Sequence, residues 1–399
     1  MVTSQTRRNK VTRRQDSTRR EVRAVEIHAI VQEVLGEVFT MDMEGSQFEK
    51  RDIFDVLIAA AVERITIEMA CELLEDAPSA NTVRSKVREM LGTEGALSEL
   101  EKCVNEMLVS RLPGKVLDSH LPAAVDMTEI PYHGEHEEDD EYVRRSKAKA
   151  GTSHFHTFGT LYVIKKHKRY TLAVTLYRRS DTPLDLLKRL LERGDEVGLG
   201  LKRLYLDRGF DNNGVVAYLT DKPFPTILPL VVRGAKGGSR KLLTGRKSRQ
   251  TTYTRQSQKY GALTLPLIIV CKYSKGRYKR RGLCRFAYVV IGQLSLPPAQ
   301  VFDEYRCRFA IEASYRMMNT VRARTTSKSI HLRLFWMAMA FLLLNLWAYV
   351  KWLFLFHTQP GPRQVLHYLL PLARWRLWLW EVVKHRLGFS LSISIPAPS

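Results

Sequence analysis

Cysteine is scarce in this sequence, and its spacing fits neither a zinc site nor a disulfide framework. The chain of 399 residues has five cysteines, none of them in a CxxC pair, and no group of Cys and His residues has metal-ligand spacing. An odd number of scattered thiols predicts reduced, structural cysteines inside a cell. The N-terminus also lacks the apolar core of a secretion signal. We therefore expect an intracellular protein without structural zinc.

Acidic residues are few relative to basic ones. Lys and Arg number 63 against 41 Asp and Glu, which gives a formal net charge of +22. Such an excess predicts a polyanionic partner, and nucleic acid is favoured over a membrane surface. A basic protein with no such partner, such as a ribosome-associated factor or a merely basic enzyme, is the alternative. A hydrophobic content of 45% is ample for packed cores and excludes wholesale disorder.

A long apolar run occurs in one segment. Residues 334–350 are apolar apart from Asn345, and Arg333 and Lys351 bound them. This length is at the short limit for a membrane-spanning helix. The tryptophans of this region are scattered along the run rather than confined to its ends. We predict a buried core helix and no membrane partner, with a membrane helix as the alternative.

The first part of the chain predicts a basic flexible arm, residues 1–24, and a helical DNA-binding domain, residues 25–115. Within that domain, residues 66–74 and 81–91 have helical periodicity and are separated by a short turn. Three basic residues project from the second helix, Arg84, Lys86 and Arg88. A helix-turn-helix reads DNA by laying such a second helix in the major groove. A plain antiparallel helix pair is the alternative.

The central part alternates strands and helices in the order β-β-β-α-β-α-β over residues 120–230, which indicates a mixed sheet flanked by helices. Strands are expected at residues 123–128, 154–165, 170–177, 203–206 and 226–230, and helices at 183–193 and 212–219. Residues 231–297 predict a mostly β insertion, with a basic loop at 234–255 and strands at 267–273 and 285–292. Residues 298–389 predict the rest of this core and C-terminal helices, and 390–399 a tail.

Three carboxylates each end an apolar run. Asp126 and Asp207 are expected at the ends of strands, and Glu312 on a helix over residues 299–319. Two metal ions roughly 4 Å apart can activate a nucleophile and stabilise a leaving oxygen in phosphodiester displacement. Because Mg²⁺ prefers oxygen ligands, three carboxylates in strand-strand-helix order predict a divalent metal site. Glu129 and Glu135 are near enough in sequence to rival Asp126.

One face of the helix at 299–319 collects the polar residues Tyr305, Arg308, Glu312, Arg316 and Asn319. At 100° per residue they fall within roughly 80° of one another. Arg308 can orient the Glu312 carboxylate and keep it ionised, or reach a DNA phosphate. Tyr305 can donate to a phosphate oxygen. A surface helix with ordinary ion pairs is the alternative.

These motifs resemble the RNase H-like catalytic domain of DDE transposases. The spacing Tyr305-x2-Arg308-x3-Glu312 is similar to the helix signature of insertion-sequence transposases that carry a β insertion before their final Glu. Asp207-Arg-Gly-Phe resembles the second carboxylate motif of that family, and Asp126 with the following Pro-Tyr-His-Gly turn resembles the first.

Two positions depart from the family pattern. Many members have a Lys seven residues after the final Glu, where this chain has Asn319, and Arg316 or Arg322 is a candidate substitute. Some members use a Trp of the insertion in processing hairpin DNA ends, but every Trp here lies at 336 or later. An aromatic such as Tyr253, Tyr260 or Tyr273 is a candidate to replace it.

The resemblance implies a DNA transposase of the cut-and-paste type. Asp126 would bridge two Mg²⁺ ions, for which Mn²⁺ can substitute, and Asp207 and Glu312 would each complete one site. Water would attack the phosphodiester at the transposon end, and the freed 3′-hydroxyl would then attack target DNA. A structure-specific nuclease or resolvase of the same fold, and a catalytically inactive DNA-binding regulator, are the alternatives.

The implied partners are double-stranded DNA, as transposon-end inverted repeats and as target, and a second copy of the chain on that DNA. The implied location is the cytoplasm of a prokaryote, at the nucleoid when bound to DNA. The residues expected to contact DNA are Arg84, Lys86, Arg88, Arg208, Arg233, Lys236, Arg240, Lys241, Arg246, Lys247, Arg249, Arg316 and Asn319.

Overall fold

The computed structural model describes residues 21–92, 97–117, 119–135, 140–165, 168–234, 237–275, 281–357 and 364–391. The strands of its main sheet are β1 (Leu121–Pro131), β2 (Arg144–Lys149), β3 (Thr152–Lys165), β4 (Lys168–Leu176), β5 (Leu201–Leu206), β6 (Thr226–Pro229), β7 (Arg249–Ser257), β8 (Gly261–Lys275) and β9 (Arg281–Ile291). A small hairpin joins β10 (Phe356–His357) to β11 (Gln364–Val365). Most of the predicted basic arm and tail lie outside the described residues.

The N-terminal helices are α1 (Ala24–Val38), α2 (Lys50–Glu63), α3 (Ile67–Leu73), α4 (Ala80–Leu91), α5 (Leu97–Val109) and the short α6 (Gly114–Leu117). The later helices are α7 (Pro183–Glu196), α8 (Asn213–Thr220), α9 (Val301–Arg306), α10 (Phe309–Met318), α11 (Ile330–Phe354) and α12 (Leu372–Leu387). In the described residues the order of strands and helices from β1 to β6 follows the predicted pattern, with β2 as one additional strand.

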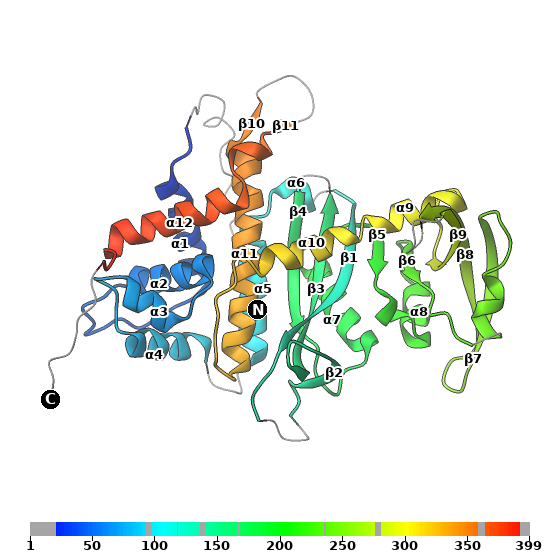
Figure 1. Cartoon of the computed structure of the whole chain (residues 1–399), viewed down its shortest axis with the longest axis horizontal. Coiled ribbons are helices and arrows are strands. Elements are labelled where there is room, and N and C mark those ends of the chain that lie inside the picture. The colour runs from blue at the N-terminus through cyan, green and yellow to red at the C-terminus, as the bar shows by residue number, and fades with distance from the viewer. Residues whose placement is uncertain are drawn as a thin grey trace, which may run out of the picture.

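The sheet is mixed and runs through the middle of the molecule, with the N-terminal helices, α11 and α12 packed at one end (Figure 1). Its hydrogen-bonded order is β2-β3-β1-β5-β6-β9-β8-β7, and β4 pairs with β3. β1, β5 and β6 are mutually parallel, and β3 is antiparallel to β1. One core lies between the sheet and helices α7 and α8, and another between its opposite face and helices α9 and α10.

The β insertion extends this sheet. β9 pairs antiparallel with β6, and β8 and β7 add outward from it. The expectation of a basic loop over residues 234–255 is wrong in its second half, where β7 begins at Arg249. The alternation of Thr251 and Tyr253 with more exposed residues suits a half-buried strand, a pattern that the polar composition of the segment conceals.

The helix predicted over residues 299–319 is two helices, α9 and α10. Between them the amides of Cys307 and Arg308 donate to the carbonyls three residues earlier, at 3.1 and 2.9 Å. Such tight i→i+3 turns in the middle of a helical segment often mark functional positions. Across this turn the guanidinium carbon of Arg308 still lies 5.6 Å from the ring centroid of Tyr305, and Nη2 of Arg308 lies 2.9 Å from Oε1 of Glu312.

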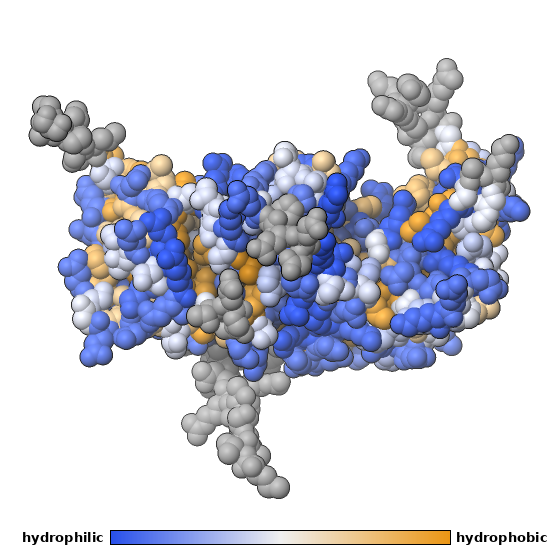
Figure 2. Space-filling model, turned by 90° about the horizontal axis from the view of Figure 1, so that it is seen from below, coloured by the Kyte–Doolittle hydropathy of each residue, from blue (hydrophilic) through white to orange (hydrophobic). Residues whose placement is uncertain are grey.

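Helix α11 is long and apolar enough to cross a membrane by length and composition, and 83% of its most apolar window is buried inside the structure. The face of the molecule in Figure 2 is mostly hydrophilic, with hydrophobic residues in small areas between the polar ones. The burial of α11 agrees with the predicted core helix. The polar residue in its middle, Asn345, bonds β4 through the amide and carbonyl of Thr171.

The helical end of the molecule is attached to the sheet at β4, the edge strand. Asn345 satisfies the backbone of Thr171, and Asn105 of α5 does the same for Val174 at 2.8 and 3.0 Å. The side-chain amides of Asn105 and Asn345 make the hydrogen bonds that a neighbouring strand would make with β4, so this edge of the sheet is covered. Residues of α1, α2, α5, α11 and α12 share one apolar core, which joins the predicted N-terminal domain to the C-terminal helices.

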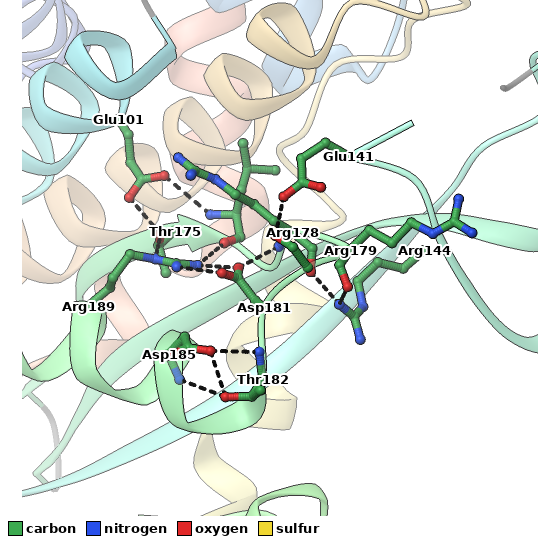
Figure 3. A network of polar contacts seen from close by, with 12 residues as sticks. Glu101, Glu141, Arg144, Thr175, Arg178, Arg179, Asp181, Thr182, Asp185 and Arg189 are labelled. Carbon is green, nitrogen blue, oxygen red and sulfur yellow. Dashed lines mark hydrogen bonds and ion pairs between the residues drawn. The ribbon is translucent and has the colours of Figure 1, made fainter. Parts of the chain in front are cut away.

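A polar network fixes the connection from β4 to α7 (Figure 3). Arg189 holds Asp181 with two hydrogen bonds at 2.5 and 2.8 Å, and it also bonds the Leu176 carbonyl at the end of β4. Glu101 of α5 accepts from Thr175 at 2.6 Å. Bidentate pairing of this kind adds geometric definition, so α5, β4 and α7 are oriented as one unit.

Candidate active site and nucleic-acid interface

Asp126 lies in the middle of β1 and not at its end as predicted, because the strand continues to Pro131, whereas Asp207 directly follows the last residue of β5. Successive residues of a strand point to opposite faces. Val125 belongs to the core under α7 and α8, whereas Ala124 belongs to the core under α9 and α10, so Asp126 faces α10. β1 and β5 are parallel with Val125 opposite Leu206, and each chain continues into a carboxylate from there.

The guanidinium of Arg308 lies among all three carboxylates. Its Nη1 is 2.7 Å from Oδ2 of Asp126, and its Nη2 is 2.9 Å from Oε1 of Glu312 and 3.6 Å from Oδ1 of Asp207. The structure therefore brings together the three acids that lie up to 186 positions apart in sequence, from Asp126 to Glu312 (312 − 126). Glu129 is not part of this group, because it pairs with Lys149 at 2.6 Å.

The three acids differ in their access to solvent. The side chain of Asp126 is 11% exposed and that of Arg308 is 6% exposed, whereas Asp207 and Glu312 are 41% and 48% exposed. Burial raises the pKa of Asp126 to about 6, against the opposing pull of Arg308 and of the Met127 amide. The site therefore has a closed side at Asp126 and an open side at the other two acids.

Tyr305 has a different contact from the one expected. Its side chain is buried, and its hydroxyl donates to the carbonyl of Leu206 at 3.1 Å, directly before Asp207. The hydroxyl therefore already has an acceptor within the chain, and a hydrogen bond from Tyr305 to a phosphate stays a prediction. The ring lies in the core between the sheet and α9, where it packs on Tyr288. Tyr305 fixes the end of β5, and with it the position of Asp207.

A second tyrosine supports the site and was missed by reasoning from the sequence. The hydroxyl of Tyr315 on α10 is 2.7 Å from the hydroxyl of Thr160, and Thr160 is the β3 partner of Asp126. Burial raises the pKa of Tyr315 well above its usual value, so it is a neutral phenol. Its spacing of three residues after Glu312 was available in the sequence, but its contact depends on the pairing of β1 with β3.

The donor set fits a hard divalent cation in its chemistry. Three carboxylates carry three negative charges when ionised, and Arg308 offsets one of them, which leaves two for cations (3 − 1). Oxygen ligands with open positions for water are what Mg²⁺ requires. Among the described residues no group of three or more Asp, Glu, His or Cys side chains forms a metal cluster as it stands, and the Arg308 guanidinium contacts all three acids.

Three residues predicted to contact DNA lie directly after Asp207, on α10 or at the end of α10. Arg208, Arg316 and Asn319 are exposed. Arg208 lines a cavity of about 560 Å³ beside Asp207, whose walls include Phe302 and Phe309. Asn319 faces a different cavity, at the far end of α10.

The helix pair α3 and α4 is present as predicted, and Ser79 caps α4 by accepting from the Thr82 amide at 3.1 Å. Two of its three basic residues have partners within the chain. Arg84 pairs with Glu68, and Lys86 pairs with Glu89 at 3.1 Å. Arg88 is exposed and lines a cavity of about 430 Å³. DNA reading by α4 stays a prediction.

The basic residues of the insertion differ in their contacts. Arg249 and Arg240 bond carbonyls of their own loop at 2.6 Å and so define its shape. Lys241, Arg246 and Lys247 are exposed. Arg233 lines a separate cavity between α7 and β7, which also includes Tyr253 and Tyr260. Lys236 lies outside the described residues.

The nine-stranded mixed sheet and its flanking helices place the chain in the mixed α/β class. Comparison of solved structures gives a similarity to piggyBac transposase in the cryo-EM structure of its synaptic complex with hairpin DNA. The TM-score is 0.51 at 10% sequence identity, over 94% of this chain and 84% of that chain. No protein-family model matches the sequence, and no curated protein matches it. At this sequence identity the likeness is one of fold.

Proposed function

We propose that this protein is a DNA transposase that binds transposon ends and catalyses metal-dependent strand cleavage and strand transfer. The observation that carries the proposal is the meeting of Asp126, Asp207 and Glu312 around one arginine, on a fold similar to that of a transposase. One carboxylate inside β1, one directly after β5 and one on the packed helix α10 supply the rigid, solvent-open arrangement that phosphodiester chemistry needs.

Each residue of the site has a distinct role in the proposal. Asp126 would be shared between two Mg²⁺ ions, with Asp207 and Glu312 each completing one binding site. The bound metals would supply an activated hydroxyl nucleophile and stabilise the leaving oxygen. Arg308 holds the acids together and offsets their mutual repulsion. Tyr305 anchors the backbone that carries Asp207.

The proposed partners follow from this activity. The net charge of +22 provides a basic surface for DNA. Joining two transposon ends requires two active sites, so we propose a homodimer on DNA. The scattered thiols support a cytoplasmic location, with the prokaryotic nucleoid as the place of action.

The test is a strand-transfer assay with the inverted repeats that flank the gene as the donor DNA and a supercoiled plasmid as the target. Asp126→Ala, Asp207→Ala and Glu312→Ala should each reduce joining to background while binding of the ends persists. Glu129→Ala is the matched control, because Glu129 lies on the same strand and pairs with Lys149. Chelation of divalent metal should abolish joining by the unaltered protein, and Mn²⁺ should restore it.

The same assay separates the alternatives. A nuclease or resolvase would cut the donor but form no joined product. A catalytically inactive regulator would bind the ends without cutting them in Mg²⁺ or Mn²⁺. Full joining by any one of the three alanine variants would remove that residue from the site.

A further inference from the structure

A second charged site lies at the far end of α10, between the sheet and the N-terminal helices. It is a cavity of about 660 Å³ at the connection from α10 to α11. Its walls come from the C-terminal end of α2, the end of β1 and the start of α11, and they include the arginines Arg64, Arg322, Arg324 and Arg333. Figure 1 places α10, α2 and α11 next to one another in this region.

The charge of this cavity is unbalanced. Its described lining has four arginines and no Asp or Glu. Within the described residues, none of the four forms an ion pair with a carboxylate. Arg333 donates to the carbonyls of Ser327 and Pro131 at 2.8 and 3.0 Å, so it is held rigidly in the wall. Burial, together with the charges of Arg333 and Arg64, lowers the pKa of Arg322 to about 10.

This arrangement has an energetic cost that a bound anion would remove. Like charges held at close range in a partly enclosed space repel one another more strongly than in water. Arginine guanidinium groups match phosphate oxygens in geometry and charge. The hydroxyls of Thr66, Thr325 and Thr326 line the same cavity and add neutral donors.

The cavity continues toward α4. A neighbouring cavity shares Arg324, Thr325, Thr326 and Trp336 with it and reaches Arg84 and Arg88 on α4. In the other direction the lining includes Asn319, which ends α10 seven residues after Glu312 (319 − 312). Seven residues of helix span roughly 10 Å. The two cavities therefore line a mostly basic path from α4 to within about two turns of the carboxylates, in which Glu68, the partner of Arg84, is the one acid of the described lining.

We propose that the cavity formed by Arg64, Arg322, Arg324 and Arg333 binds backbone phosphates of DNA and carries the strand from α4 to the carboxylate site. The inference rests on the proposed DNA-directed function and specifies which surface guides the strand. The connection between α10 and α11 is the guiding element, because the amide of Arg324 is tied to the Ile65 carbonyl at 3.1 Å. That bond holds the connection in place whatever side chain stands at 324.

The test is the salt dependence of binding to a fluorescein-labelled DNA duplex of mixed sequence, measured by anisotropy. The double variant Arg322→Gln with Arg324→Ala removes two phosphate contacts. Each contact contributes roughly 0.9 to the slope of log K against log salt, so the slope should fall by roughly 1.8. Lys202→Ala is the matched control, since Lys202 is exposed at the end of β5 remote from Asp207. Its slope should change by no more than experimental error.

Thermal melting without DNA gives a second measurement. If Arg322 is held against like charges, Arg322→Gln should raise the melting temperature. A lower melting temperature together with an unchanged salt slope would overturn the inference, because it would identify Arg322 as a purely structural residue. An unchanged slope in a well-folded double variant would overturn it too.

Inorganic phosphate separates the two sources of the phosphate group. Stabilisation of the unaltered protein by millimolar phosphate, lost in the double variant, together with unchanged duplex binding would indicate a site for a free anion and would overturn the DNA assignment. The strand-transfer assay keeps the two proposals distinct. Joining with unchanged salt slopes would leave the function standing without this site, whereas altered slopes without joining would leave the site standing without the function.

Discussion

The carboxylate site and the arginine cavity are opposite charge arrangements at the two ends of one helix. At the start of α10 a single guanidinium serves three acids, and at its end four arginines meet no acid in the described lining. Each cluster has an excess of one sign of charge. The first is suited to cations and the second to anions, as an enzyme that holds metal ions and a DNA backbone together would require.

The largest effect is expected from removing the single cation of the carboxylate site. Arg308→Ala would leave Asp126 buried without its partner, and breaking a buried ion pair in this way costs roughly 3–5 kcal/mol. Chemical denaturation should show a loss of stability of that order, and strand transfer should be lost. Arg306→Ala is the control, since Arg306 is exposed two residues earlier. Equal stability of the two variants would contradict a central role for Arg308.

A gain in stability is expected from neutralising the buried acid. The pKa of Asp126 is raised to about 6 from an ordinary value of 3.8, so the folded state loses stability as the pH rises from 3.8 to 6. Above pH 6 the penalty amounts to about 3 kcal/mol. Asp126→Asn should therefore be more stable than the unaltered protein at pH 8 by up to this amount, while strand transfer is abolished.

Melting curves at pH 8 and pH 4 check this expectation. The difference between the variant and the unaltered protein should shrink at pH 4, where the acid is largely protonated in the folded state. If the variant is less stable at pH 8, the attraction between Arg308 and the Asp126 carboxylate outweighs the cost of burying that charge.

A smaller effect is expected at His156, whose pKa is affected by Arg333 of the arginine cavity. Burial, together with the charge of Arg333, lowers the pKa of His156 to about 3. The unfolded chain therefore binds a proton first as the pH falls, and stability is lost between pH 6.5 and 3. At pH 5 the loss is about 2 kcal/mol.

His156→Phe should reduce the stability difference between pH 7.5 and pH 5 by about that amount, measured by urea denaturation at both pH values. The stacking of ring 156 on Tyr132, at 5.0 Å, can be kept by Phe. Retention of the full pH dependence in the variant would show that other groups cause it.

The comparison also shows which features could be read from the sequence. The strand order, the helix pair α3 and α4 and the burial of α11 follow from periodicity, which depends only on neighbouring residues. Asp207 and Glu312 stood out because a distinctive local motif surrounds each. The contact of Tyr305 with the Leu206 carbonyl could not be read from helical spacing, because it depends on how α9 packs against β5.

The arginine cavity could not have been found from the sequence. Arg64 belongs to α2, and Arg322, Arg324 and Arg333 belong to the connection and the start of α11, so nothing in their spacing relates them. Likewise the insertion reads as a separate polar segment, whereas its strands extend the central sheet through the pairing of β9 with β6.

The sequence by itself determined the elements, the net charge and the identity of the acids, because these depend on composition and on short-range periodicity. Only the tertiary structure decided that one arginine serves all three acids, that Tyr305 faces the sheet and that four arginines gather at the end of α10. The reason is physical: charge interactions act over distances of a few ångströms in space, and the pairing of strands and the packing of helices, not separation along the chain, set those distances.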